Sequence, residues 1–270
     1  MAPIQPKTPA EIECMREAGE LLARVFDEMG GEVCEGVTTD HLDRVAAGVI
    51  RRLGAKPSFL NYHKYPKTIC TSVNEEVVHG IPGSRVLEAG DIVSVDMGLI
   101  YRGFHADRAT TFPVGRISPE IMQLLQVTRE CLARAIRAAQ PGSRLFDIGA
   151  AVEELATAHG YGIVRDYSGH GIGRKLHEYP QVPNFVPPKG SKAREEGNPR
   201  LIPGVTLAIE PMINLGTHRT RTLSDKWTVV TADGLPSAHF EHTVLITEDG
   251  PEILTGEQPA LKELELDTPA

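Results

Sequence analysis

The sequence lacks a long apolar run. Its longest nearly apolar stretches, such as residues 92–100, carry Asp96 and fall far short of the length that a membrane span requires. Residues 1–9 contain no apolar core of the kind that marks a signal peptide. We therefore expect a soluble cytoplasmic protein with no membrane partner.

Cysteine is scarce, and basic residues are outnumbered by acidic ones. The four cysteines are scattered without a CxxC pair, which argues against a disulfide framework or a zinc finger. Lysine and arginine number 28 against 36 for aspartate and glutamate, so the net charge is −8. Because a nucleic-acid surface normally shows a basic excess, we expect no nucleic-acid binding as the main function. At 270 residues, the chain is long enough to bury a real core.

Four helices are predicted, in two pairs. Thr8, Pro9 and Glu11 form a capping-box pattern with proline at the first helical position, which starts the first helix. Glycine and proline after each stretch of helical periodicity mark where the helices end. The predicted helices cover residues 9–29, 39–53, 118–139 and 145–159.

After each helix pair the hydrophobic period changes to two, which is typical of strands. Two strand pairs are predicted, over residues 92–97 with 105–112 and over residues 205–210 with 241–246. Residues 187–203 have the composition of a surface loop. Residues 215–239 form a long excursion that contains the single tryptophan, Trp227. The segment after about Leu254 is polar and is predicted to be a loose end.

The order of two helices followed by strands occurs twice. Residues 20–24 resemble residues 130–134, and Asp96 in the first strand pair matches Glu210 in the second at an offset of 114. Chance similarity between amphipathic helices is the alternative explanation. We predict an α+β fold of two related halves about a pseudo-two-fold axis, with helices backing a curved antiparallel sheet. The predicted organisation is a lead over residues 1–8, one domain over 9–254 with halves at about 9–115 and 116–254, and a tail over 255–270.

Two aspartates lie on the first predicted strand pair. If Tyr101 and Arg102 form the turn, Asp96 and Asp107 are directly opposite, with Cβ atoms about 4.5–5.5 Å apart. Two like charges at this distance repel each other, and a divalent cation bound by their oxygens would remove the repulsion. The alternative is that both are exposed polar residues on the solvated face of a hairpin.

The repeat brings two more acids to the same place. Glu210 occupies the position of Asp96, and Glu241 corresponds to Asp107 on the return strand. Four uncompensated carboxylates at the centre of a domain would be strongly unfavourable. Two bridging divalent ions, about 3.5–4 Å apart, would resolve this.

Three histidines lie near short glycine-rich segments. Residues 168–173 could pass for a phosphate-binding loop, but they lack the Lys-Ser/Thr ending of a P-loop. Two histidines seven residues apart, His170 and His177, are ordinary on their own. Beside four carboxylates, one of them can complete a metal site and the other can hydrogen-bond a substrate. His79, next to a Gly-Ile-Pro turn, would by itself more often be structural.

Together these residues form an ordered set of motifs. They are VVHGIP (77–82), VDMG (95–98), Asp107 with TTF (110–112), GHGIG (169–173), LHE (176–178), IEPM (209–212) and FEHT (240–243). In this set the chain resembles the bacterial type I methionine aminopeptidases, which have the duplicated pita-bread fold. The resemblance extends from about residue 8 to residue 254, nearly the whole chain.

The resemblance implies a role for each matching residue. The implied ligands of two divalent ions (cobalt, manganese, iron or zinc) are Asp96, Asp107, His170, Glu210 and Glu241. Asp107 and Glu241 would bridge the ions, Asp96 would hold one ion, and His170 with Glu210 would hold the other. The implied catalytic residues are His79, His177 and Glu210. The implied substrate-binding residues are His79, His177, Tyr62, His63, Tyr65, Cys70 and Trp227.

The resemblance also implies substrates and partners. The substrates would be nascent polypeptides and short peptides with an N-terminal methionine and a small second residue, and a ribosome contact near the exit tunnel and a monomeric state are expected. Leu176 departs from the aromatic residue often found before the second histidine, so we expect a different pocket wall there. The loop between His177 and Glu210 is a few residues longer than in common bacterial members and far shorter than the type II insertion.

Two other functions are compatible with the same motifs. An Xaa-Pro aminopeptidase or prolidase would share the fold and the ligands, although such enzymes usually carry an extra N-terminal domain. A non-catalytic pita-bread protein that binds peptides or partner proteins would typically have lost metal ligands, and this chain keeps all five.

Overall fold

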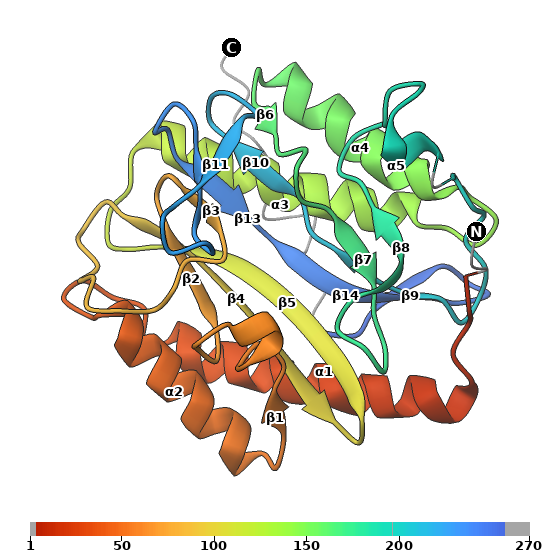
Figure 1. The fold of residues 1–270 in the computed structure, drawn as a ribbon, viewed down its shortest axis with the longest axis horizontal. Coiled ribbons are helices and arrows are strands. Elements are labelled where there is room, and N and C mark those ends of the chain that lie inside the picture. Colours follow the sequence, from red (N-terminus) through yellow and green to blue (C-terminus); the bar gives the residue numbers. More distant parts are fainter. Residues whose placement is uncertain (1–3, 196, 257–270) are drawn as a thin grey trace.

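The computed structural model describes residues 4–195 and 197–256. Four long helices pack against a curved central sheet, with α1 and α2 under one half and α3 and α4 over the other (Figure 1). The helices are α1 (Pro9–Gly30), α2 (Thr39–Arg52), η1 (Tyr62–Lys64), α3 (Pro119–Ala138), α4 (Leu145–Ala158) and α5 (Lys192–Glu195). In the described part of the chain, none of these helices is long and apolar enough to cross a membrane.

The four long helices begin and end within one residue of their predicted bounds. The capping box at Thr8 forms as predicted, because its side chain accepts a hydrogen bond from the Glu11 amide and the Glu11 carboxylate accepts one from the Thr8 amide. Each helix pair buries its apolar face in its own half. One core cluster draws its buried residues from positions 18–114, and another draws all but Ile92 from positions 124–246.

One nine-stranded sheet joins the two halves. Its main path is β1-β4-β5-β14-β9-β7-β8, with β2 paired to β4 and β15 paired to β14. Its strands are β1 (Lys56–Pro57), β2 (Cys70–Val73), β4 (Ile92–Tyr101), β5 (Phe104–Pro113), β7 (Gly169–Gly171), β8 (Glu178–Val182), β9 (Thr206–Ile209), β14 (Glu241–Ile246) and β15 (Pro251–Ile253). The β5–β14 pairing is the seam between the halves, and it lies at the centre of the sheet.

Two three-stranded sheets complete the described fold. They contain β3 (Glu76–Val78), β6 (Gly162–Ile163), β10 (Met212–Asn214), β11 (Thr220–Thr222), β12 (Val229–Thr231) and β13 (Ser237–His239). Three of these strands lie in the predicted excursion over residues 215–239, and the predicted loop over 187–203 contains the short helix α5. Thr255, in the predicted tail, is buried and its hydroxyl lies 3.0 Å from His242 Nδ1, whereas the tail from residue 257 onward lies outside the described residues.

The predicted register of the first hairpin was wrong by two residues. Tyr101 pairs with Phe104, so the turn is Arg102-Gly103 and not Tyr101-Arg102. Both turn residues have positive φ (48° and 82°), as the type I′ turn of a two-residue hairpin requires. Glycine adopts such a φ without strain. Asp96 is therefore opposite Ala109, and Asp107 is opposite Gly98.

Candidate active site

The observed register brings acidic residues from both halves together at the β5–β14 pairing. Ala109 pairs with Asp96 on one side and with Glu241 on the other. Paired residues project from the same face of a sheet, and so does Asp107, which lies two residues before Ala109. The small side chain of Ala109 leaves space between the flanking carboxylates. Three acids from three neighbouring strands therefore face the same volume.

The second half adds an acid and an imidazole. His242 pairs with Ile209, so Glu210 lies beside Glu241, one position beyond the end of β9. His170 on β7 pairs with Ala208, two residues before Glu210. Its Nε2 lies 3.5 Å from Glu210 Oε1 and 3.9 Å from Asp107 Oδ2.

The glycines around His170 serve close strand packing. A Cβ on Gly169 would lie 2.3 Å from the Ala208 carbonyl oxygen, and one on Gly171 would lie 2.5 Å from the Tyr179 carbonyl oxygen. Only glycine allows β7 to lie this close to its two neighbours. The glycine-rich segment is thus explained by the packing that places His170.

Two carboxylates of this cluster are buried, Asp96 and Glu210 are half-buried, and few hydrogen-bond donors reach any of them. Asp107 and Glu241 are 4% and 2% exposed. Asp107 Oδ1, Glu241 Oε1 and Asp96 Oδ1 have no hydrogen-bond partner among the described residues. Within that same part of the chain, no lysine or arginine nitrogen lies within 4.0 Å of these carboxylates. Buried oxygens of this kind call for a cation.

Burial raises the pKa of every acid in the cluster. The Asp107 pKa is raised to about 7 by burial. Burial and the neighbouring Asp107 raise the pKa of Asp96 and of Glu241 well above their usual range. Burial, followed by Asp96, does the same for Glu210. A bound cation would reverse these shifts, because it favours the ionised form.

The donor set fits divalent metal ions. Ligand atoms of Asp107, His170 and Glu241 all lie within 4.8 Å of one another. Burial lowers the His170 pKa to about 3, so its imidazole is neutral and available as a ligand. Carboxylate oxygens with one imidazole nitrogen suit manganese, iron, cobalt or zinc.

A tyrosine orients the second histidine. The Tyr62 hydroxyl lies 2.7 Å from His177 Nδ1, and the two rings stack with centroids 5.4 Å apart. Burial, then Asp107, raises the Tyr62 pKa, and burial, then His63, lowers the His177 pKa. In the tautomer in which the hydroxyl donates to a neutral imidazole, the His177 proton is on Nε2.

His79 lies on the other side of the cavity in a left-handed conformation, with φ of 62°. Its ring makes edge contacts with Tyr167 and Trp227, at centroid distances of 5.4 and 6.2 Å. Burial, then His177, lowers the His79 pKa to about 4, so this ring is also neutral near pH 7.

All of the residues singled out from the sequence line one cavity of about 470 Å³. Its lining is Phe59, Tyr62, His63, Tyr65, Cys70, His79, Asp96, Asp107, His170, Leu176, His177, Gln181, Glu210, Trp227 and Glu241. The sequence reasoning missed Phe59 and Gln181. Gln181 pairs with His170 across β7 and β8, a contact that no short-range pattern indicates.

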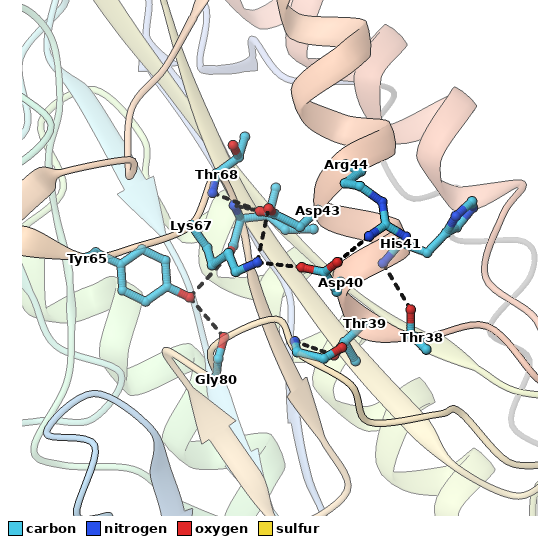
Figure 2. A network of polar contacts seen from close by, with 12 residues as sticks. Thr38, Thr39, Asp40, His41, Asp43, Arg44, Tyr65, Lys67, Thr68 and Gly80 are labelled. Carbon is cyan, nitrogen blue, oxygen red and sulfur yellow. Dashed lines mark hydrogen bonds and ion pairs between the residues drawn. The ribbon is translucent and has the colours of Figure 1, made fainter.

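The apolar end of the cavity is anchored to α2 (Figure 2). The Tyr65 hydroxyl donates to the carbonyl oxygens of Ile69 and Gly80, at 3.1 and 2.9 Å. An Asp43 oxygen accepts hydrogen bonds from the Thr68 and Ile69 amides, at 2.8 and 3.1 Å. This holds the segment leading to Cys70 against the helix. Burial raises the Cys70 pKa, so its thiol is an apolar wall and not a nucleophile.

Comparison with known proteins agrees with this site. The model of the metallopeptidase family M24 matches residues 13–248. The chain belongs to this family. Metallopeptidases of the family act through divalent metal ions, which the carboxylate cluster is suited to hold.

Within this family, the chain is similar to proteins named methionine aminopeptidase. Methionine aminopeptidase 1 of Bacillus subtilis is 48% identical over 249 residues, which cover 92% of this chain and 98% of that protein. The crystal structure of a methionine aminopeptidase from Thermotoga maritima superposes with a TM-score of 0.89 at 44% identity, covering 94% of this chain and all of that one. A prolidase from Pyrococcus furiosus shares the fold at 24% identity, with a TM-score of 0.72, 93% of this chain and 65% of that one covered. The pita-bread fold expected from the motifs is confirmed.

Proposed function

We propose that this protein removes the initiator methionine from nascent polypeptides and short peptides when the second residue is small. The observation that carries the proposal is the cluster of buried, donor-poor carboxylates beside a partly apolar cavity. Relatives that are 45–48% identical bear the name methionine aminopeptidase, which supports the same specificity here.

Two divalent ions (cobalt, manganese, iron or zinc) would be held by this cluster. The residues that would hold them are Asp96, Asp107, His170, Glu210 and Glu241. When bound, the ions supply Lewis-acid polarisation of the peptide carbonyl and lower the pKa of water towards neutrality.

The residues of the chain itself position the peptide and move protons. Glu210 is the proposed general base, which takes a proton from the attacking water at a carboxylate oxygen and passes it to the leaving amine. His177 would donate from Nε2 to the developing oxyanion, and its bond to Tyr62 supports that protonation state. His79, neutral near pH 7, would hydrogen-bond the scissile amide.

The apolar end of the cavity would select the methionine side chain. Its proposed walls are Tyr65, Cys70, Leu176 and Trp227, with Tyr62 and His63 at its border. Each methylene changes binding by only about 1–3 kcal/mol, so the shape of the pocket must exclude larger side chains. Leu176 is smaller than an aromatic residue and would leave that part of the wall wider.

The proposed setting of this reaction is the cytoplasm, where a monomer would meet nascent chains near the ribosomal exit tunnel. The substrates themselves are the only partners that the catalytic proposal requires.

The test is a comparison of peptides with and without metal. We expect metal-stripped protein to be inactive on Met-Ala-Ser and to regain hydrolysis when Co²⁺ or Mn²⁺ is added, with little release from Xaa-Pro peptides. Preferential Xaa-Pro cleavage would instead support the prolidase alternative, and no cleavage of any peptide in the metal-loaded state would support a non-catalytic binding protein. Elemental analysis of anaerobically purified protein, paired with activity, identifies the ion.

A further inference from the structure

A second histidine lies beside Glu210 and belongs to none of the roles assigned above. His239 is the last residue of β13, and its side chain is 1% exposed. Thr111 fixes its backbone, because the Thr111 hydroxyl donates to the His239 carbonyl oxygen at 2.8 Å and lies 2.9 Å from the His239 amide. The backbone at His239 is therefore held by a residue of the neighbouring strand β5.

Both ring nitrogens of His239 lack a hydrogen-bond partner among the described residues. A buried polar group left in this state costs about 1–3 kcal/mol. An imidazole ring carries at least one N–H in either protonation state. Packing alone would be served better by an apolar side chain, so the imidazole calls for an acceptor.

The Glu210 carboxylate is an acceptor close to this ring. His239 Nε2 lies 3.8 Å from Glu210 Oε2, while the other oxygen, Oε1, lies 3.5 Å from His170 Nε2. Glu210 thus lies between two imidazoles, one on each oxygen.

We propose that His239 is a positioning residue for Glu210, donating a hydrogen bond from Nε2 to Oε2 and so leaving Oε1 on the His170 side to bind metal. The proposal rests on the proposed metal site. A side-chain movement of about 1 Å closes the present 3.8 Å gap to an ordinary N–H···O distance. Partners of this kind fix the orientation of a ligand, and their loss typically weakens metal binding by about 10–100-fold.

The first experiment titrates Co²⁺ into metal-stripped protein by calorimetry. In His239→Leu we expect the same number of bound ions as in wild type, with one of them bound about tenfold or more weakly. His239→Gln restores an N–H donor and should recover most of the affinity, which removal of a merely structural ring would not predict. Thermal unfolding of each metal-free variant checks that the fold is retained.

The matched control is His242→Leu. His242 is also buried, but its Nδ1 lies 3.0 Å from the Thr255 hydroxyl, so this ring already has a hydrogen-bond partner. We expect this variant to bind Co²⁺ with nearly wild-type affinity. Equal weakening in both variants would overturn the proposal.

Two further outcomes also overturn it. If His239→Leu binds Co²⁺ as wild type does, the histidine positions nothing, and if it loses one ion completely, the histidine is itself a ligand. A second measurement needs no substitution: in the Zn²⁺-loaded wild type labelled with ¹⁵N-histidine, nuclear magnetic resonance should find the His239 proton on Nε2, and a proton on Nδ1 contradicts the proposal. Wild-type protein that binds no Co²⁺ at all would instead refute the proposed metal site.

Discussion

Two groups of buried acids in this molecule differ in how their oxygens are satisfied. Asp43, at the start of α2, accepts hydrogen bonds from two backbone amides and lies 3.9 Å from the Lys67 ammonium (Figure 2). Asp107, on β5, has one oxygen with no hydrogen-bond partner in the described part of the chain, and the acids Asp96, Glu210 and Glu241 surround it.

The difference separates a structural acid from a functional one. Every donor near Asp43 comes from the segment that it holds in place, so the network is complete without a ligand. The cluster around Asp107 gathers like charges without donors, an arrangement that is stable only when the acids keep protons or share a cation. The same residue type thus supports the fold in one region and, in our proposal, binds metal in the other.

The largest expected effect comes from removing a charge from the cluster. In Asp107→Asn we expect activity on Met-Ala-Ser to fall on the order of 10³-fold or more, since loss of an outer partner alone already weakens a metal site by about 10–100-fold. The metal-free fold should be retained, because the amide replaces a carboxylate of which one oxygen has no hydrogen-bond partner among the described residues. Turnover is measured beside circular dichroism of the same samples.

Asp96→Asn and Glu241→Gln should behave in the same way. Near wild-type turnover in any of the three variants would contradict the two-metal proposal, whereas an unfolded variant would contradict the view that these acids do not support the fold.

The sequence predicted the helices well and the contacts between strands less well. Helix ends depend on local chemistry, such as the Thr8–Glu11 capping box, which a short segment contains in full. The register of β4 and β5 depends on which two residues form the turn, and the prediction overlooked that Arg102-Gly103 suits positive φ better than Tyr101-Arg102. The error did not move either aspartate to the other face, because a shift of two preserves the alternation.

The prediction that four acids meet in one site was based on the internal repeat. It brought Glu210 and Glu241 to the aspartates before any strand pairing was known, and the structure places all four acids in one cavity. The residues that were missed reach the site by non-local pairing. Ala109 spaces two carboxylates that are 145 positions apart in the sequence. His239 is positioned by Thr111 of another strand.

The second prediction concerns the pH dependence of metal-free stability. The folded pKa of Asp107, about 7, lies above its value of about 3.9 in an unfolded chain. The folded state therefore binds the extra proton, and stability is lost as pH rises from about 4 to about 7. Over this pH range the free energy of unfolding of the metal-free wild type should fall by about 4 kcal/mol more than that of Asp107→Asn. Urea unfolding of both proteins at pH 5 and pH 7.5 measures the difference, and parallel pH profiles would refute it.

The third prediction concerns Asp43, the acid whose hydrogen bonds are complete without a ligand. In Asp43→Ala the amides of Thr68 and Ile69 lose their acceptor, which should lower the free energy of unfolding by about 3 kcal/mol. Metal binding should survive, because Asp43 does not line the cavity. Urea unfolding and Co²⁺ calorimetry are compared on the same preparation. A variant of wild-type stability that has lost its metal would show that the Asp43 network belongs to the site.

The smallest expected effect concerns the hydrogen bond between Tyr62 and His177, and tests whether this bond contributes to catalysis. Tyr62→Phe removes the donor to His177 Nδ1 but keeps the ring that stacks on His177. The imidazole then loses the preference for the Nε2 proton, so a fraction of molecules cannot donate to the oxyanion. Because one hydrogen bond contributes about 0.5–1.5 kcal/mol, we expect kcat to fall up to about tenfold with little change in KM.

Tyr161→Phe is the control for this substitution, since its hydroxyl donates to Gln123, a residue outside the cavity. It should leave both kinetic constants unchanged. A rise in KM with constant kcat in Tyr62→Phe would mean that Tyr62 only binds substrate. In that case the hydrogen bond between Tyr62 and His177 would contribute to substrate binding and not to stabilising the transition state.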